Sequence, residues 1–143
     1  MVIVAAAAVF GRILTLEQIS NNVASAMLSI SDNPIIFLLL VNILLLIVGT
    51  FMETIAAVII LTPVLLPLSA QMGIDPVHFG IVMIVNLSIG FITPPLGMNL
   101  FVPSSISNIK IVQLSKGIIP GFIALVIVLF IITYISWFAL ALV

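Results

Sequence analysis

Residues 34–73 form a run of 40 residues in which Glu53 is the only charged side chain. The whole chain is 64% hydrophobic and 5% charged, whereas a soluble domain carries about 25% charged residues. Helices can span a bilayer because they satisfy their backbone hydrogen bonds internally. We therefore predict an all-α integral membrane protein. The net charge is −1 without the basic cluster that nucleic-acid binding needs, and no catalytic motif indicates an enzyme.

The apolar run is interrupted near its middle by the segment Gly49–Thr54. The arm before it, residues 34–48, would rise roughly 22 Å as a helix, which is less than a roughly 30 Å hydrocarbon core. No polar loop separates this arm from the next one. We predict a re-entrant hairpin over residues 34–73 with its tip at Gly49–Thr54. The alternative is two tilted spanning helices with a tight turn at the surface.

A second interruption lies at Gly90–Asn108, whose sequence is GFITPPLGMNLFVPSSISN. Irregular backbone at membrane depth is stable only where it is buried in protein or lines a watery cavity, and such breaks mark transport sites. Residues 76–109 are too many for one straight crossing and too few for two crossings with a loop. We predict one transmembrane helix that is broken near its middle. The alternative is a proline kink without a functional role.

The N-terminal part of the chain is predicted to hold two short helices. Residues 2–14 are apolar, but they are too short to span the membrane. Residues 15–31 have the amphipathic pattern of a helix that lies in the membrane plane, with Thr15 as its N-cap. Residues 1–31 are therefore predicted to be a truncated helix followed by an interfacial helix.

The C-terminal part is predicted to hold a short polar connection, residues 110–116, and one plain spanning helix, residues 117–143. The connection carries Lys110 and Lys116, and loops rich in lysine stay in the cytoplasm. The mouth of the hairpin is then expected on the outer side of the membrane.

Both interruptions carry small side chains with oxygen atoms. Unwound carbonyls and helix C-terminal ends suit a desolvated Na⁺, because hard cations prefer oxygen ligands. The candidate Na⁺ ligands are Thr50, Glu53, Thr93 and Asn99. The full predicted ion and substrate site comprises Gly49, Thr50, Glu53, Thr54, Thr93, Pro94, Pro95, Gly97 and Asn99.

The roles of four polar residues in or near apolar segments need separate interpretation: Glu53, His78, Asn42 and Asn86. An intramembrane carboxylate such as Glu53 is an ion ligand or a proton carrier, or it is held by nearby amides without a transport role. His78 lies at the start of a helical segment near the surface, where a lone histidine is expected to be solvated; the alternative is a role in proton coupling. Asn42 and Asn86 lie on apolar helices and are expected to hydrogen-bond between helices.

Three motifs together, G-x-F-x-E, D-P-x-x-F-G and T-P-P-x-G-x-N-L-F, run through the segment GTFMETIAAVIILTPVLLPLSAQMGIDPVHFGIVMIVNLSIGFITPPLGMNLFV. This segment resembles the C-terminal part of the large permease subunit of TRAP transporters, the DctM-like tripartite ATP-independent periplasmic type. The resemblance extends over essentially the whole chain, residues 1–143, and implies roughly the last third of such a subunit. Residues 49–54 then match a hairpin tip and residues 93–99 an unwound helix.

The resemblance implies a fold of the ion-transporter superfamily, in which inverted repeats each contribute a hairpin and a broken helix. It implies a multi-pass protein of the bacterial inner membrane that moves organic acids such as C4-dicarboxylates or sialic acid, with Na⁺ as the coupling ion. A periplasmic substrate-binding protein and a small membrane subunit would be its partners. The alternatives are a proton-coupled transporter of the same superfamily and a membrane protein that serves only in assembly.

Overall fold

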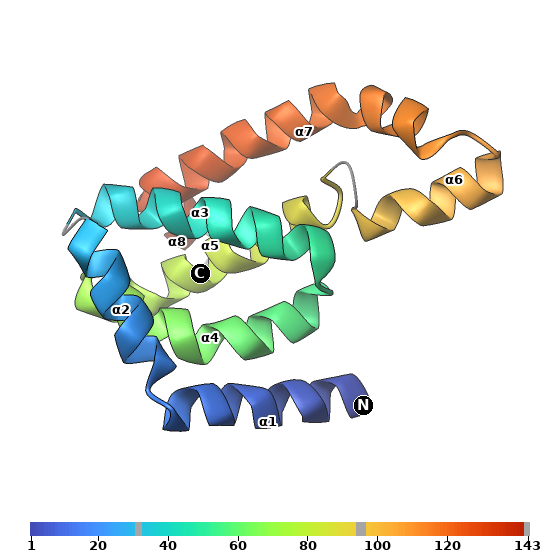
Figure 1. The fold of residues 1–143 in the computed structure, drawn as a ribbon. Coiled ribbons are helices and arrows are strands. Elements are labelled where there is room, and N and C mark those ends of the chain that lie inside the picture. The colour runs from blue at the N-terminus through green and yellow to red at the C-terminus, as the bar shows by residue number, and fades with distance from the viewer. Residues whose placement is uncertain (31–32, 94–96, 142–143) are drawn as a thin grey trace.

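The computed structural model describes residues 1–30, 33–93 and 97–141, and the regular elements in these ranges are helices (Figure 1). In chain order they are α1 (Val2–Leu16), α2 (Ile19–Ile30), α3 (Pro34–Phe51), α4 (Thr54–Gln71), α5 (Pro76–Gly90), the short 3₁₀ helix η1 (Met98–Leu100), α6 (Phe101–Ser107), α7 (Ile111–Tyr134) and α8 (Ser136–Leu140). The prediction of an all-α protein is therefore confirmed for the described part of the chain.

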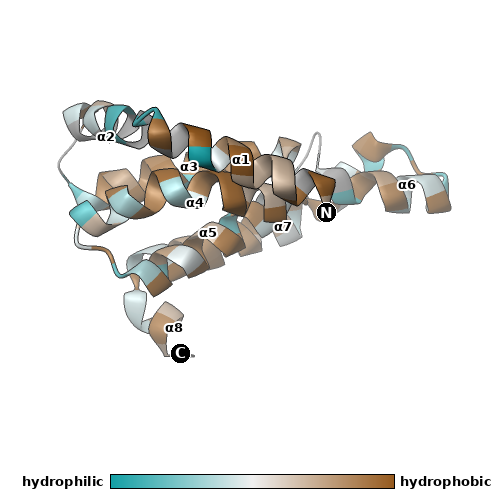
Figure 2. Cartoon of the chain, turned by 90° about the horizontal axis from the view of Figure 1, so that it is seen from below, coloured by the Kyte–Doolittle hydropathy of each residue, from teal (hydrophilic) through white to brown (hydrophobic). Residues whose placement is uncertain are grey.

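Three of these helices are long and apolar enough to cross a membrane: α3 and α4 with 18 residues each, and α7 with 24. The helix α5 is also apolar but shorter, with 15 residues. The helix α2 is visibly more polar than its neighbours when the chain is coloured by hydropathy (Figure 2). The chain is thus a multi-pass helical membrane protein.

The core lies where the two arms of the hairpin meet α5. Its largest buried side chains come from all three helices: Phe37, Val41 and Leu45 of α3, Leu65 and Leu68 of α4, and Phe79, Met83 and Leu87 of α5. The arm α3 packs mainly on α5, whereas α4 packs on both α5 and α1. The helices α3 and α5 run in the same direction, and α4 and α7 run opposite to them (Figure 1). Both α3 and α5 therefore end at the same side of the molecule.

Side-chain caps define the beginnings of these helices. Asn33 accepts a hydrogen bond from the backbone N–H of Ile35 at 3.0 Å. Asp75 accepts from the N–H groups of Val77 at 2.8 Å and His78 at 3.2 Å. Because the first turn of a helix leaves its N–H groups without partners inside the helix, each cap fixes where its helix starts.

The predicted N-cap role of Thr15 is wrong, because α1 continues through this residue to Leu16. The N–H of Glu17 still donates to the carbonyl of Ile13 at 2.9 Å. The chain turns at Gln18, whose φ of 52° lies in the left-handed region, and α2 begins only at Ile19. A left-handed residue ends a helix because it cannot continue the right-handed path.

Two expectations for the C-terminal part also need correction. The segment 110–116 is not a separate connection, because the carbonyl of Lys110 accepts from Gln113 and Leu114 and starts α7. The segment 117–143 is not one plain helix, because α7 ends at Tyr134 and the backbone bends at Ile135, with φ −110° and ψ 84°. The bend lets α8 fold against α5 and bury Ala139. Residues 142–143 lie outside the described ranges.

Candidate ion and substrate site

Two glycines bring the hairpin tip and the broken helix together. Gly49, in the last turn of α3, lies against Gly90, the last residue of α5. A Cβ added at Gly90 would lie 2.7 Å from the Cα of Gly49, and a Cβ added at Gly49 would lie 2.9 Å from the carbonyl oxygen of Leu87. Only glycine permits so close an approach of two backbones, as in the small-residue contacts of membrane helices. The two interruptions predicted from the sequence therefore adjoin in space.

The turn of the hairpin is shorter than expected. Gly49, Thr50 and Phe51 still belong to α3, and Thr54 already begins α4, so the turn consists of Met52 and Glu53. With 18 residues, α3 would rise about 27 Å, which is close to the roughly 30 Å of a hydrocarbon core, so its length permits a crossing. The hairpin tip is nevertheless a sharp reversal in an apolar segment.

Glu53 caps the N-terminus of α4. Its Oε1 accepts from the N–H of Ile55 at 2.9 Å and its Oε2 from the N–H of Ala56 at 3.1 Å. This is the arrangement in which nearby amides hold a tip carboxylate, one of the alternatives left open for Glu53. The negative charge also complements the positive end of the helix dipole. The two amides use only part of the carboxylate's capacity, because its oxygens offer about four acceptor positions.

The break after α5 is stabilised by local hydrogen bonds. The hydroxyl of Thr93 donates to the carbonyl of Ile89 at 2.8 Å, and the N–H of Gly97 donates to the carbonyl of Thr93 at 2.9 Å. A Cβ on Gly97 would lie 2.8 Å from the carbonyl carbon of Ile92, so the loop folds back too closely for any other residue. Asn99 is exposed, and its N–H points to the carbonyl of Phe91 at 3.4 Å. The predicted site residues Pro94 and Pro95 lie outside the described ranges.

The threonines at the two interruptions are arranged alike. Thr50 donates its hydroxyl proton to the carbonyl of Ile47 at 2.7 Å, just as Thr93 does to Ile89. A hydroxyl that donates to a nearby backbone carbonyl still presents oxygen lone pairs to a ligand. The C-terminal ends of α3 and α5 both reach this region, and each carries the partial negative charge of a helix dipole. The arrangement suits a cation with oxygen ligands.

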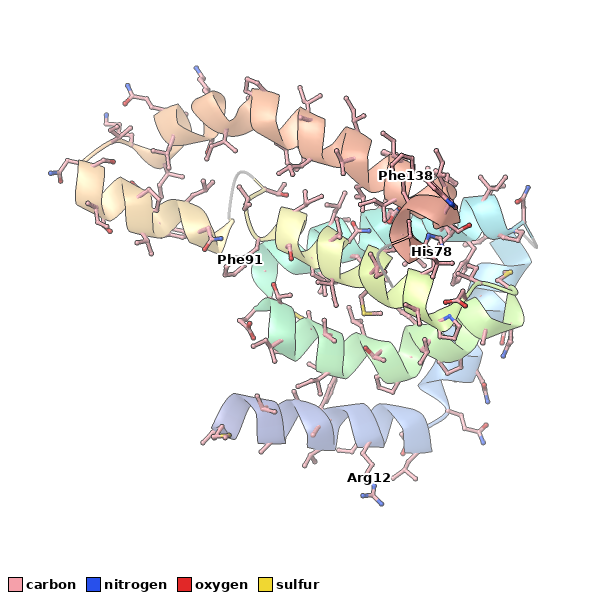
Figure 3. All side chains as sticks on the ribbon, turned by 180° about the vertical axis from the view of Figure 1, so that it is seen from behind. Arg12, His78, Phe91 and Phe138 are labelled. Carbon is pink, nitrogen blue, oxygen red and sulfur yellow. The ribbon has the colours of Figure 1, made fainter. Side chains whose placement is uncertain are left out.

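The expectation for His78 is wrong. Its side chain is 5% exposed, and its Nε2 lies 2.8 Å from the carbonyl oxygen of Ile132 in α7. His78 and Phe91 lie at opposite ends of α5, so the histidine is remote from the break (Figure 3). Ile132 lies in α7 shortly before the bend at Ile135, and both α7 and, after the bend, α8 pack on α5. Sequence periodicity gives no sign of that bend.

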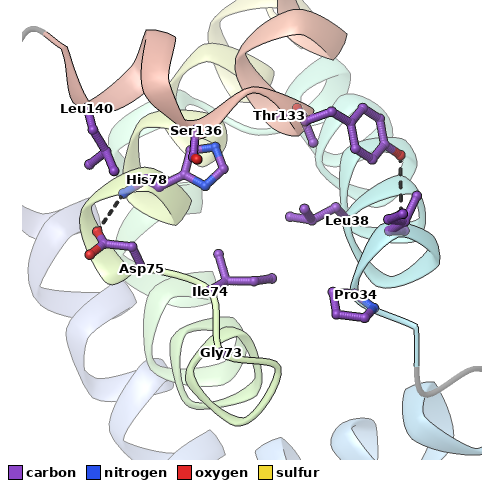
Figure 4. Close-up of a pocket in the computed structure, with 11 residues that line it drawn as sticks. Pro34, Leu38, Gly73, Ile74, Asp75, His78, Thr133, Ser136 and Leu140 are labelled. Carbon is purple, nitrogen blue, oxygen red and sulfur yellow. Dashed lines mark hydrogen bonds between the residues drawn. The ribbon is translucent and has the colours of Figure 1, made fainter.

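A cavity of about 350 Å³ lies beside His78, between the start of α3, the α4–α5 turn and the bend before α8 (Figure 4). Its polar lining includes Asp75, Thr133 and Ser136. Tyr134 closes one side by donating its hydroxyl to the carbonyl of Ile35 at 3.2 Å. The cavity is at the end of the hairpin away from its tip, so it is separate from the candidate site.

Asn42 and Asn86 do bond between helices, as expected, and Thr133 of α7 joins them. The Nδ2 of Asn86 donates to the Oδ1 of Asn42, and the Nδ2 of Asn42 donates to the Oγ1 of Thr133 at 3.1 Å. All three side chains are at most 1% exposed. The sequence did not predict an interhelical bond for Thr133, because the hydroxyl of a threonine in an apolar helix commonly bonds to the backbone of the same helix. It does that here too, with the carbonyl of Leu129 at 2.7 Å.

Comparison with known protein families gives a match over residues 1–138 to the model described as "Tripartite ATP-independent periplasmic transporter, DctM component". The chain belongs to this DctM family. The resemblance seen in the sequence motifs is therefore confirmed. Members of the family are transport proteins rather than enzymes.

Three relatives illustrate the match. The isethionate TRAP transporter permease protein DctMQ of Oleidesulfovibrio alaskensis is 52% identical over 94% of this chain and 21% of its own length. The C4-dicarboxylate TRAP transporter large permease protein DctM of Pseudomonas aeruginosa is 44% identical over 99% of this chain and 33% of its own. The sialic acid TRAP transporter large permease protein SiaM of Vibrio cholerae is 46% identical over 94% of this chain and 31% of its own length. The chain thus spans a third or less of these relatives.

Proposed function

We propose that these residues supply one hairpin and one broken helix of a TRAP permease that couples Na⁺ to the uptake of an organic acid. The observation that carries the proposal is the contact between Gly49 and Gly90, which joins two interruptions of apolar helices in a member of the DctM family. Transporter sites are typically built from such discontinuous helices, with carbonyls and helix C-terminal ends around the cation. The hairpin is proposed to be re-entrant.

Thr50 and Thr93 are the proposed Na⁺ ligands with the best support. Thr50 donates its hydroxyl proton to a carbonyl of α3, and Thr93, in the break, donates to a carbonyl of α5, so the oxygen lone pairs of both are available to a cation. Asn99 and the backbone carbonyls of the break complete the proposed set. Glu53 contributes its charge at the tip, and its unused acceptor positions make it a further candidate ligand.

The substrate class follows from what the relatives' names have in common. Isethionate, C4-dicarboxylates and sialic acid are all organic anions. Between Pro34 and Asn108 this chain contains no lysine or arginine. The anion is therefore proposed to be neutralised by the bound Na⁺, by helix N–H groups, or by parts of the permease outside these residues. A small membrane subunit and a periplasmic binding protein are the proposed partners, in the bacterial inner membrane.

The competing function is proton coupling through Glu53, since this is the single charged side chain of residues 34–73. Uptake by proteoliposomes separates the two, with a full-length permease that contains these residues, its partner subunits and a labelled organic acid. One series varies Na⁺ at fixed pH, and the other imposes a pH gradient without Na⁺. We expect uptake only in the Na⁺ series. We also expect Glu53→Gln to weaken the Na⁺ dependence more than it weakens membrane insertion.

Full uptake without Na⁺, driven by the pH gradient and abolished by Glu53→Gln, would assign the function to proton coupling. Residues 1–143 reconstituted alone should give no uptake above protein-free vesicles, because sites in inverted-repeat transporters are completed by both halves. Accumulation by these residues alone would contradict the proposed division of the site.

A further inference from the structure

Three buried polar side chains connect α3, α5 and α7 inside an otherwise apolar core. We call Asn42, Asn86 and Thr133 the polar clasp. Their hydrogen bonds link residues 44 and 91 positions apart in the sequence. Asn42 is the only polar residue of α3 before Gly49, and Thr133 is the first polar residue of α7 after Lys116. The clasp therefore joins α3 and α7 through side chains on both helices, whereas a second bond between them runs from the Tyr134 hydroxyl to the backbone carbonyl of Ile35.

The clasp lies close to the glycine contact on the same pair of helices. Asn42 precedes Gly49 by seven residues, roughly 10 Å along α3, and Asn86 precedes Gly90 by four, roughly 6 Å along α5. Leu45 and Leu87 fill the space between the two contacts and are fully buried. The polar clasp and the glycine contact thus fix two points of one helix pair.

Apolar packing alone does not determine the register of α3 on α5, that is, which residues of the two helices lie opposite one another. Its first arm, PIIFLLLVNILLLIV, presents a large aliphatic side chain on nearly every face. A slip of one residue moves a helix by 1.5 Å and rotates it by about 100°. Leucine would then face the core again, but the amides would separate and Val48 or Thr50 would replace Gly49 against Gly90. A single buried asparagine specifies register in coiled coils for the same reason.

We propose that Asn42 and Asn86, supported by Thr133, are positioning residues that set the register of α3 on α5 and so hold the hairpin tip beside the helix break. This inference rests on the proposed function, because it assigns the clasp a role in shaping the Na⁺ site. None of the three residues is proposed to touch Na⁺ or substrate. Their effect is on where Thr50 and Thr93 lie.

The test compares single and double substitutions in a full-length permease that contains these residues. In Asn42→Leu, the Nδ2 of Asn86 loses its hydrogen-bond acceptor. The Oδ1 of Asn86 already has no partner among the described residues, so the buried amide of Asn86 is left without a hydrogen bond. An unpaired buried amide lowers thermal stability whether or not it has a positioning role. The double variant Asn42→Leu/Asn86→Leu removes both amides, and such paired replacement can restore stability. Ser115→Ala, which removes an intrahelical hydroxyl of α7 outside the clasp, is the matched control.

The decisive readouts are register and Na⁺ affinity in the double variant. Register is measured as the distance distribution between spin labels at Ile47→Cys and Ser88→Cys, two exposed positions on α3 and α5. Wild type and Ser115→Ala should each give one narrow distribution. The double variant should give a broad or shifted one. Its Na⁺ concentration for half-maximal uptake should rise by about threefold or more, the change expected from one interhelical hydrogen bond of ordinary strength.

A double variant with the wild-type distance distribution would overturn the proposal, whatever its stability. So would a wild-type Na⁺ dependence combined with an altered distance distribution. If the wild-type permease shows no Na⁺ dependence at all, the proposed function fails, and the link between the clasp and a Na⁺ site fails with it. The spin-label distances would still report separately on the register of α3.

Discussion

Alanine at position 90 would place a methyl carbon 2.7 Å from the Cα of Gly49 and 2.9 Å from the carbonyl oxygen of Leu46. Favourable contacts between carbon atoms lie at about 3.5–4.0 Å, so α3 and α5 would have to separate by roughly 1 Å. Both obstructing atoms belong to the backbone, and no side-chain rotation relieves them. Overpacking of this kind costs about 1–3 kcal/mol, and we expect Gly90→Ala to lower stability by an amount in that range.

Gly80→Ala is the matched control on the same helix. A Cβ at Gly80 meets nothing within 4 Å, so alanine there should be neutral or stabilising, by up to about 1 kcal/mol from helix propensity. The assay is thermal unfolding of both variants in detergent, with the Na⁺ dependence of uptake as the functional readout. We expect Gly90→Ala to raise the Na⁺ concentration for half-maximal uptake and Gly80→Ala to leave it unchanged. Equal stability and equal Na⁺ dependence of the two variants would refute the close contact at Gly49.

Three further predictions concern the break, a helix cap and the topology. Gly97→Ala should destabilise the loop after α5 and reduce uptake, because its Cβ would lie within 2.9 Å of the carbonyl oxygen of Phe91; thermal unfolding and uptake together measure this. Asp75→Ala should lower stability by about 1 kcal/mol through loss of the α5 cap, whereas Asp75→Asn should retain it, as unfolding of the two variants would reveal. A cysteine at Thr50 should react poorly with a bulky impermeant thiol reagent, while one at Gln71 should react from outside. Strong cytoplasmic labelling at position 50 would instead indicate two full crossings.

The features that the sequence could predict are local ones. The apolar run of residues 34–73 and the clustered prolines and glycines after Gly90 identify the arms, the turn and the break, because each depends on a few neighbouring residues. The caps at Asn33 and Asp75 were not predicted, although they are equally local, since each side chain bonds to N–H groups two or three residues ahead. The family motifs lie in these same local segments.

The features that the sequence could not predict depend on contacts between distant segments. Nothing near Gly49 indicates that it meets Gly90, because that contact depends on α3 and α5 running side by side in the same direction. His78 was expected to be solvated, but it is buried, and its ring bonds to the carbonyl of Ile132, 54 residues away. Thr15 looked like a helix cap because its side chain suits one, yet the left-handed residue that separates α1 from α2 is Gln18. The glycine contact and the burial of His78 depend on tertiary structure, whereas the end of α1 depends on the backbone conformation of Gln18.

The most direct test of the central claim is whether Na⁺ binds at the adjoining interruptions. A ligand that binds the folded state raises stability in proportion to the logarithm of its concentration above its dissociation constant. Thermal unfolding of a full-length permease that contains these residues is therefore measured in Na⁺ and in K⁺ at equal ionic strength. The comparison includes Thr50→Val/Thr93→Val, which removes two hydroxyl oxygens and keeps the shape. Na⁺ should stabilise the wild type selectively and the double variant much less. Equal stabilisation of both proteins by Na⁺, or none of the wild type, would contradict the proposed site.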